Sequence, residues 1–121
     1  MEQGKLVYIA SPYAGDVETN VIFARAACQY VVRQGCTPIA VHLLYPQFLD
    51  DSVPEEREAG LQMGRRVLEA CDELWLCGER VSAGMEAELK EAERLGIPVR
   101  CVAKQEIVME PEPSPMGVCL C

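Results

Sequence analysis

The residue with the clearest chemical potential is Glu88, a carboxylate inside the apolar stripe of a predicted helix. On a wheel of about 100° per residue, Glu88 falls between the apolar positions Met85 and Leu95 of the segment 82–95. Burying a carboxylate is costly unless it is paired or used. Glu88 is therefore either a salt-bridged or boundary residue, or a glutamate held in a ligand pocket near a helix N-terminus as a nucleophile or base. Helix geometry alone leaves both alternatives open.

Three segments at the ends of predicted strands are the other places where we expect chemistry, namely residues 11–16, 42–47 and 78–84. Ligands of open α/β sheets bind in the crevice beyond the carboxyl ends of the strands. The first segment carries neither of the glycine patterns that bind dinucleotides or triphosphates. These segments supply the candidate substrate-binding residues: Ser11, Tyr13, His42, Tyr45, Ser82 and Gly84.

The hydrophobic pattern predicts strands that alternate with helices. Short apolar runs predict strands at residues 5–10, 38–41, 73–78 and 98–103. Amphipathic periodicity predicts helices from residue 17 to a stop at Gly35, over 54–70, and over 82–95 before Gly96. Ser52-x-x-Glu55 has the form of a capping box for the second helix. This order is typical of the α/β class: a three-layer Rossmann-like or flavodoxin-like sandwich with a parallel sheet of four or five strands, the fifth at 106–109.

The length and composition fit one globular domain. The chain has 121 residues, of which 50% are hydrophobic and 25% are charged. At this length about two-thirds of the unfolded surface can be buried, so a core forms without disulfides or metal. The periodic pattern stops after Lys104, which predicts a domain over residues 1–104 and an acidic tail with proline and cysteine over 105–121.

The charge and the cysteines exclude several classes of partner. Asp and Glu number 19 against 11 Lys and Arg, and the net charge of -8 repels nucleic acid and anionic membrane surfaces. Seven cysteines without a CxxC pair and a single histidine do not form a zinc pattern. No apolar run approaches the ~20 residues of a membrane span, and we find no signal peptide. We therefore expect a cytoplasmic protein with no metal and with neither nucleic acid nor a membrane as partner.

Three segments together resemble a known superfamily. They are Tyr8-Ile9-Ala10-Ser11-Pro12-Tyr13, then Cys71-Asp72-Glu73-Leu74-Trp75, then Ser82 to Ala92. Over residues 5 to about 103 the chain resembles the nucleoside 2-deoxyribosyltransferase-like superfamily, and within it the uncharacterised DUF4406-type proteins. The resemblance implies that Glu88 attacks the anomeric carbon of a nucleoside, expels the base and forms a glycosyl ester, which a second base or water then resolves. It implies no cofactor.

The resemblance also suggests roles around Glu88, each with a structural alternative. Ser82 matches a serine that contacts the 5′-phosphate in the nucleotide N-glycosidase branch, where transferases carry aspartate; alternatively, or in addition, it caps the helix. Tyr13 matches a residue near the sugar, or packs over the sheet edge. Gly84 either lets the chain pass close to a ligand or serves an ordinary turn.

One departure from the family concerns the leaving base. Relatives usually hold an aspartate in the helix before the third strand, and Gly64 stands at that position here. The candidates to take its place are Gln62, Glu58 and His42. His42 is a candidate proton donor or base contact, the alternative being a structural histidine. Tyr45 shares its segment and is suited to stack on a base. Asp72 lies at the end of the sheet remote from the crevice and is expected to be structural.

These observations lead to one functional hypothesis with two alternatives. The hypothesis is cleavage or exchange of the N-glycosidic bond of a nucleoside or nucleoside 5′-monophosphate. The first alternative is a non-catalytic nucleotide-binding or sensing module, as Gly64 would allow. The second is an interaction protein that acts through its tail. Relatives complete their sites across subunits, so the resemblance implies a homo-oligomer, for which the apolar segment 43–49 offers a surface.

Overall fold

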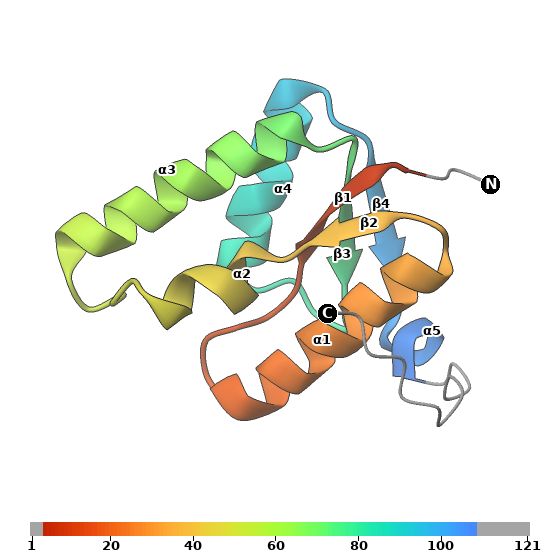
Figure 1. Cartoon of the computed structure of the whole chain (residues 1–121), viewed down its shortest axis with the longest axis horizontal. Coiled ribbons are helices and arrows are strands. Elements are labelled where there is room, and N and C mark those ends of the chain that lie inside the picture. The colour runs from red at the N-terminus through yellow and green to blue at the C-terminus, as the bar shows by residue number, and fades with distance from the viewer. Residues whose placement is uncertain (1–3, 109–121) are drawn as a thin grey trace.

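The computed structural model describes residues 4–108. Its elements, in chain order, are β1 (Leu6–Ala10), α1 (Val17–Arg33), β2 (Thr37–Ile39), α2 (Val41–Leu44), the 3-10 helix η1 (Tyr45–Gln47), α3 (Pro54–Ala70), β3 (Glu73–Cys77), α4 (Ala83–Leu95), β4 (Val99–Val102) and α5 (Lys104–Val108) (Figure 1). The predicted alternation of strands and long helices is confirmed.

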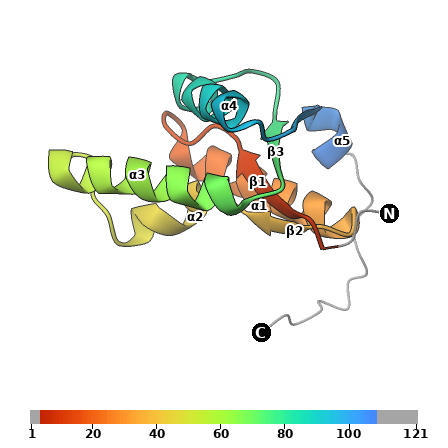
Figure 2. The ribbon, with the colours of Figure 1, turned by 90° about the horizontal axis from the view of Figure 1, so that it is seen from above.

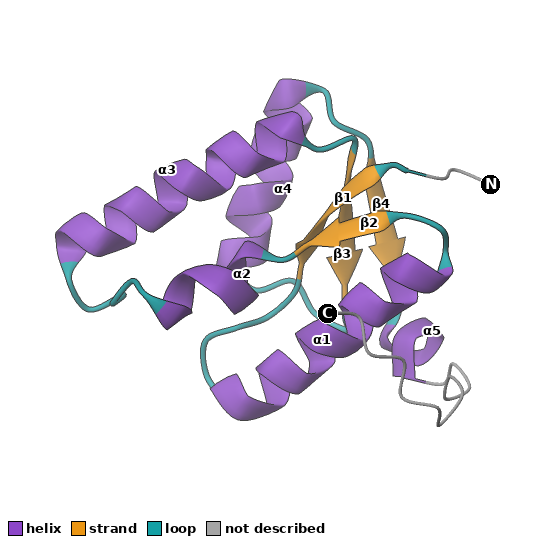
Figure 3. Cartoon of the chain, in the orientation of Figure 1, coloured by secondary structure: helices purple, strands orange, loops and turns teal. Residues whose placement is uncertain are grey.

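The strands form one parallel sheet in the order β2-β1-β3-β4 (Figure 3). β1 and β3 occupy the centre and are apolar on both faces, because helices cover both faces of a parallel sheet. The α/β class with a parallel sheet of four strands is therefore as predicted.

Helices lie on both faces of the sheet (Figure 2), and the two faces bury separate clusters of side chains. Side chains alternate along each strand, so neighbours in β1 and β3 enter opposite clusters. Val7 and Trp75 pack with residues of α1 and α5, whereas Tyr8 and Leu74 pack with residues of α3 and α4. The second cluster therefore includes Tyr8 of β1 together with residues of α3 and α4.

The ends of the long helices follow the predicted stop signals. Gly35 follows the C-cap of α1 and has a φ of +85°. Gly96 is itself the C-cap of α4 and has a φ of +74°. Helix α3 has the predicted bounds, but its capping box is not formed. Its N-cap is Val53, and Ser52 instead donates its hydroxyl to the Asp50 carboxylate.

Two short segments differ from the prediction. The strand expected over 38–41 ends at Ile39, because Val41 begins α2 and is buried in the core beside Tyr8. Residues 42–47, for which no helix was expected, belong to α2 and η1. Residues 104–108 are helix α5, where we expected a strand over 106–109; Met109 lies outside the described residues. Glu106 accepts a hydrogen bond from the Ala103 N–H at the start of α5, and this contact favours a helical turn.

Helix α5 also bears on the predicted domain boundary at residue 104. Ile107 is 2% exposed and belongs to the same cluster as Trp75. We expect Ile107→Ala to lower the free energy of unfolding by about 2–4 kcal/mol, through lost burial and the cavity left behind. Urea denaturation measures the change, with the half-exposed Val108→Ala as the control. A loss as small as that of the control would place α5 outside the folded domain.

Candidate active site

Glu88 lies in the second turn of α4 and turns toward the sheet. Its Oε2 accepts a hydrogen bond of 2.6 Å from the hydroxyl of Tyr8 in β1. Tyr8 is only 2% exposed, so its ring holds the hydroxyl in a fixed place. Within residues 4–108, Glu88 forms no ion pair. Its partner is a neutral phenol, which leaves the negative charge of the carboxylate uncompensated.

This environment changes the proton affinity of both groups. Burial raises the pKa of Glu88 to about 7, and the hydrogen bond from Tyr8 opposes that rise. The pKa of Tyr8 lies well above its usual range, first because of burial and then because of the Glu88 charge. Tyr8 is therefore the donor at any physiological pH, and Glu88 changes charge near neutrality.

Helix α3 passes close to this pair at Gly64, where the resemblance led us to expect an aspartate. A Cβ built on Gly64 would lie 3.6 Å from the Tyr8 hydroxyl and 3.9 Å from Cγ2 of Val41. Gly64 is itself buried. Gly64 therefore lies beside the Tyr8–Glu88 pair, where any side chain would contact the Tyr8 hydroxyl.

A second polar pair follows β1 and β2 at the carboxyl ends of the strands. The Ser11 hydroxyl and Nε2 of His42 are 2.7 Å apart, and Ser11 is buried. The ring of Tyr13 meets that of His42 edge-on, with centroids 6.4 Å apart. Burial lowers the pKa of His42 to about 4, so its imidazole is neutral at pH 7.

Three predicted binding residues line one groove between α2, η1 and the first half of α3. The groove has a volume of about 470 Å³, and Tyr13, His42 and Tyr45 form part of its wall. Its charged residues are Asp50, Asp51, Glu56 and Arg57. Glu88 is not among the lining residues. Val41, which lines the groove, packs in the same cluster as Tyr8, the hydrogen-bond partner of Glu88.

Ser82 and Gly84 lie apart from the groove, at the N-terminus of α4. The Ser82 hydroxyl accepts a hydrogen bond of 3.2 Å from the Met85 N–H, so Ser82 caps the helix. A Cβ on Gly84 would meet nothing nearer than the Ser82 hydroxyl at 4.0 Å, so no close approach within the described residues requires a glycine. Contacts of Ser82 with a phosphate and of Gly84 with a ligand remain predictions.

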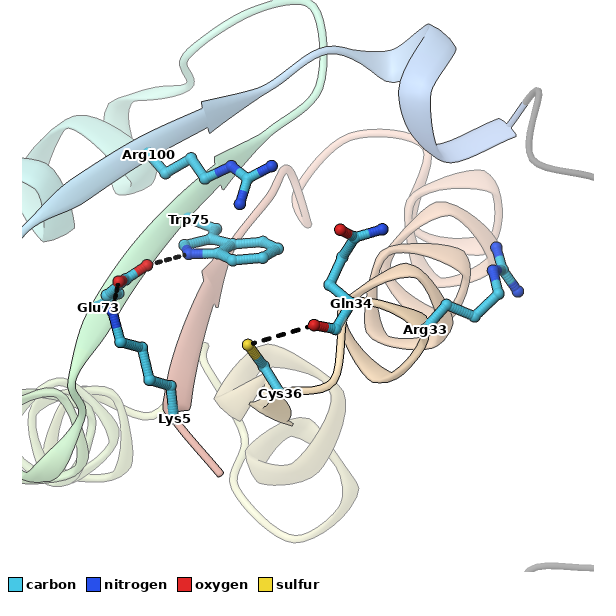
Figure 4. Close-up of a pocket in the computed structure, with 7 residues that line it drawn as sticks. All are labelled: Lys5, Arg33, Gln34, Cys36, Glu73, Trp75 and Arg100. Carbon is cyan, nitrogen blue, oxygen red and sulfur yellow. Dashed lines mark hydrogen bonds and ion pairs between the residues drawn. The ribbon is translucent and has the colours of Figure 1, made fainter. Parts of the chain in front are cut away.

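A different pocket lies near the amino ends of the strands, and the sequence did not suggest it (Figure 4). It has a volume of about 360 Å³ and is lined by Lys5, Arg33, Gln34, Cys36, Glu73, Trp75 and Arg100. Glu73 accepts hydrogen bonds from Lys5 and from the Trp75 indole, and the Arg100 guanidinium lies 4.4 Å from the Trp75 ring centre. Asp72 acts structurally nearby, as predicted, by accepting from the Leu6 N–H.

The described part of the chain offers no metal centre and no membrane span. Among residues 4–108, no group of three or more His, Cys, Asp or Glu side chains is placed to hold a metal ion. None of the helices in that range combines the length and the apolar character needed to cross a bilayer.

Comparison with solved structures shows that the fold is that of the nucleoside 2-deoxyribosyltransferases. The chain is similar to the 2-deoxyribosyltransferase of the psychrotolerant bacterium Bacillus psychrosaccharolyticus, with a TM-score of 0.68 and 19% identity over 81% of this chain and 72% of that one. It is also similar to the 2-deoxyribosyltransferase of Leishmania mexicana, with a TM-score of 0.56 and 16% identity over 82% of this chain. The match spans 64% of the Leishmania chain, less than two thirds of its length.

Comparison with family models identifies the family to which the chain belongs. Residues 5–102 match the domain of unknown function DUF7768, and the protein belongs to this family. The matching model is therefore not that of DUF4406, and the expected closer likeness to DUF4406-type proteins is not confirmed. A search of curated proteins found no match.

Proposed function

We propose that this protein cleaves or exchanges the N-glycosidic bond of a nucleoside or nucleoside 5′-monophosphate, with Glu88 as the nucleophile. The observation that carries the proposal is the hydrogen bond between Glu88 Oε2 and the Tyr8 hydroxyl, in a half-buried setting without a cationic partner. A purely structural carboxylate would be paired or solvated. A nucleophile needs the opposite, a carboxylate that is oriented but not neutralised.

The reaction follows from the two oxygens of Glu88. Tyr8 holds Oε2, while Oε1 makes no hydrogen bond to any residue of the described range. Oε1 attacks the anomeric carbon, a C–O bond forms as the C–N bond breaks, and the electron pair of that bond leaves on the base nitrogen. Water or a second base then attacks the anomeric carbon of the ester and releases the Glu88 carboxylate.

The groove beside α2 has the character of a base-binding site. Planar heterocycles bind well to aromatic side chains, and Tyr13, Tyr45 and His42 provide three rings in its wall. Tyr45 also lies near enough to Tyr8 to contribute to the raised pKa of Tyr8, which connects the groove to the Glu88 side of the molecule. The proposal requires that a base bound in this groove places its sugar within reach of Glu88.

A non-catalytic nucleotide-binding or sensing module is the second candidate function. It is favoured by Gly64, which places no acid beside the Tyr8–Glu88 pair, and by the absence of Glu88 from the groove wall. A module of this kind would bind nucleosides in the groove without forming an ester.

Incubation with a panel of nucleosides and nucleoside 5′-monophosphates tests the proposal. We expect the wild-type protein to release free base, detected by chromatography, and to carry a glycosyl adduct on Glu88 in the mass spectrum of a quenched reaction. Ligand binding by calorimetry with no base released and no adduct would identify the binding module instead.

A substitution at Ser82 distinguishes between a nucleoside and a nucleoside 5′-monophosphate as the substrate. We expect Ser82→Ala to lower the free energy of unfolding by about 1 kcal/mol through loss of the cap. If Ser82 also binds phosphate, its loss raises KM for a monophosphate by roughly tenfold while KM for the nucleoside stays unchanged. Ser82→Thr keeps the hydroxyl and is the control. Equal changes in both KM values would leave Ser82 as a cap alone.

An assembly of identical chains is part of the proposal. Three large apolar side chains close to the groove are well exposed: Leu44 at 45%, Phe48 at 60% and Leu61 at 50%. Such a patch favours burial against a second copy, which would close the groove from outside. Light scattering measures the mass in solution, and Phe48→Glu is expected to yield monomers. A cytoplasmic location also stays a prediction.

A further inference from the structure

The Ser11–His42 pair has a consequence for the protonation of the imidazole. The Ser11 hydroxyl lies 2.7 Å from Nε2 of His42, and Ser11 makes no other side-chain hydrogen bond in the described range. If Nε2 carried the proton and donated it to Ser11, the buried Ser11 O–H would be left without an acceptor there. If Ser11 donates to Nε2, both groups are satisfied. The hydrogen bonding therefore favours the His42 tautomer with its proton on Nδ1.

The remaining ring nitrogen is accessible. Within residues 4–108, no buried side-chain nitrogen or oxygen lacks a hydrogen-bond partner. Nδ1 of His42 bonds to no described residue, so solvent reaches it. His42 lines the groove, so the Nδ1–H is the donor that a ring held by Ser11 can offer to a ligand there.

We propose that His42, held by Ser11 in the Nδ1–H form, donates a hydrogen bond to the departing base and stabilises the negative charge that develops on it. The inference rests on the proposed function. His42 would assist the departing base in place of the aspartate that the resemblance led us to expect at position 64. No proton need be transferred to the base within the site: the electron pair of the C–N bond moves onto the base, His42 stabilises it through the N–H, and water protonates the released base.

A neutral imidazole suits this role. Burial lowers the pKa of His42 to about 4, so the ring carries no charge that the carboxylates of the groove would attract. Among the titratable groups of the groove wall, Tyr13 contacts the ring directly, while Asp50, Asp51, Glu56 and Arg57 come from the η1–α3 connection and α3. A fixed N–H dipole assists departure of the base without a change of charge on the protein.

The tautomer is directly measurable, because His42 is the only histidine in the sequence. Nitrogen-15 NMR of protein labelled at histidine is expected to show a proton on Nδ1 and none on Nε2 at pH 7, the reverse of the form preferred in water. Ser11→Ala should restore the Nε2–H form. A wild-type ring protonated on Nε2 overturns the inference whatever the protein's activity.

Leaving-group dependence tests the functional part. The probes are 2′-deoxyuridine against its 5-fluoro derivative, and 2′-deoxyguanosine against its 7-methyl derivative, whose base departs more readily. We expect His42→Gln, which ends near Nε2, to slow the poorer substrate of each pair tenfold or more beyond its effect on the better one. His42→Asn places an amide near Nδ1 and should restore most of the rate.

Two outcomes would overturn this role. Equal losses with both members of a pair would show that His42 does not assist departure of the base. A wild-type protein that turns over none of the four probes and forms no Glu88 adduct overturns the proposed function, and the role of His42 falls with it. The NMR result distinguishes the two cases, since it establishes the tautomer without turnover.

Discussion

Glu88→Gln is expected to reduce base release by at least roughly a thousandfold, since an amide oxygen does not form the glycosyl ester. Glutamine has the same shape, and its carbonyl still accepts the hydrogen bond from Tyr8. Substrate binding should therefore persist, which calorimetry measures. Glu93→Gln removes an exposed carboxylate from the same helix and is the matched control, with activity close to that of the wild type.

The same variant should be more stable than the wild type at pH 8. The pKa of Glu88 is about 7 in the fold against 4.5 for an ordinary glutamate, so the folded state binds this proton more tightly than the unfolded chain. Its contribution to stability is complete below about pH 4.5 and is lost as the pH rises through 7. Glutamine has no such loss. We expect a gain of roughly 1–2 kcal/mol at pH 8 and none at pH 4, measured by urea denaturation.

Retained activity in Glu88→Gln would remove Glu88 as nucleophile, and a loss of stability at pH 8 would mean that the carboxylate is well solvated in the fold. A gain in stability together with a loss of activity is the pattern of a site in which function is maintained at a cost to the fold. The Glu93 control should show neither effect.

The long elements were predictable because each buries one continuous face. β1 and β3 are short apolar runs, as strands covered on both faces must be. α3 and α4 carry apolar stripes at the helical period and end at the predicted residues. α2, η1 and α5 are too short to show any period, so packing against the core determines them and their sequences alone do not.

Glu88 was identifiable for a local reason, whereas its partners were not. A carboxylate within an apolar stripe stands out in a single helix. Tyr8 is 80 residues away in a central strand, where tyrosine is an ordinary residue. Ser11 and His42 were each candidates, but their separation of 31 positions in the sequence concealed that they form a pair. The pocket at the amino ends of the strands was missed because its residues come from several distant segments.

The acid limb of the pH profile follows from the environment of Glu88. Only the ionised carboxylate attacks the sugar, so base release should fall about tenfold for each pH unit below about 7. His42, with a pKa of about 4, does not titrate on this limb. Burial also raises the pKa of Cys71, a neighbour of Tyr8, to about 11, so that thiol stays neutral throughout. Glu88 is therefore the group whose ionisation the limb reports.

Tyr8→Phe tests this assignment. The hydrogen bond from Tyr8 lowers the pKa of Glu88, so its removal should move the acid limb to higher pH and reduce activity most at and below neutrality. Carbon-13 NMR of the glutamate carboxyl groups, with Glu88→Gln to identify the signal, measures the same shift without turnover. An acid limb near pH 4.5, or one unmoved in Tyr8→Phe, would show that burial and Tyr8 do not control this carboxylate. The limb and the NMR titration should agree, because both depend on the desolvation of one side chain held between β1 and α4.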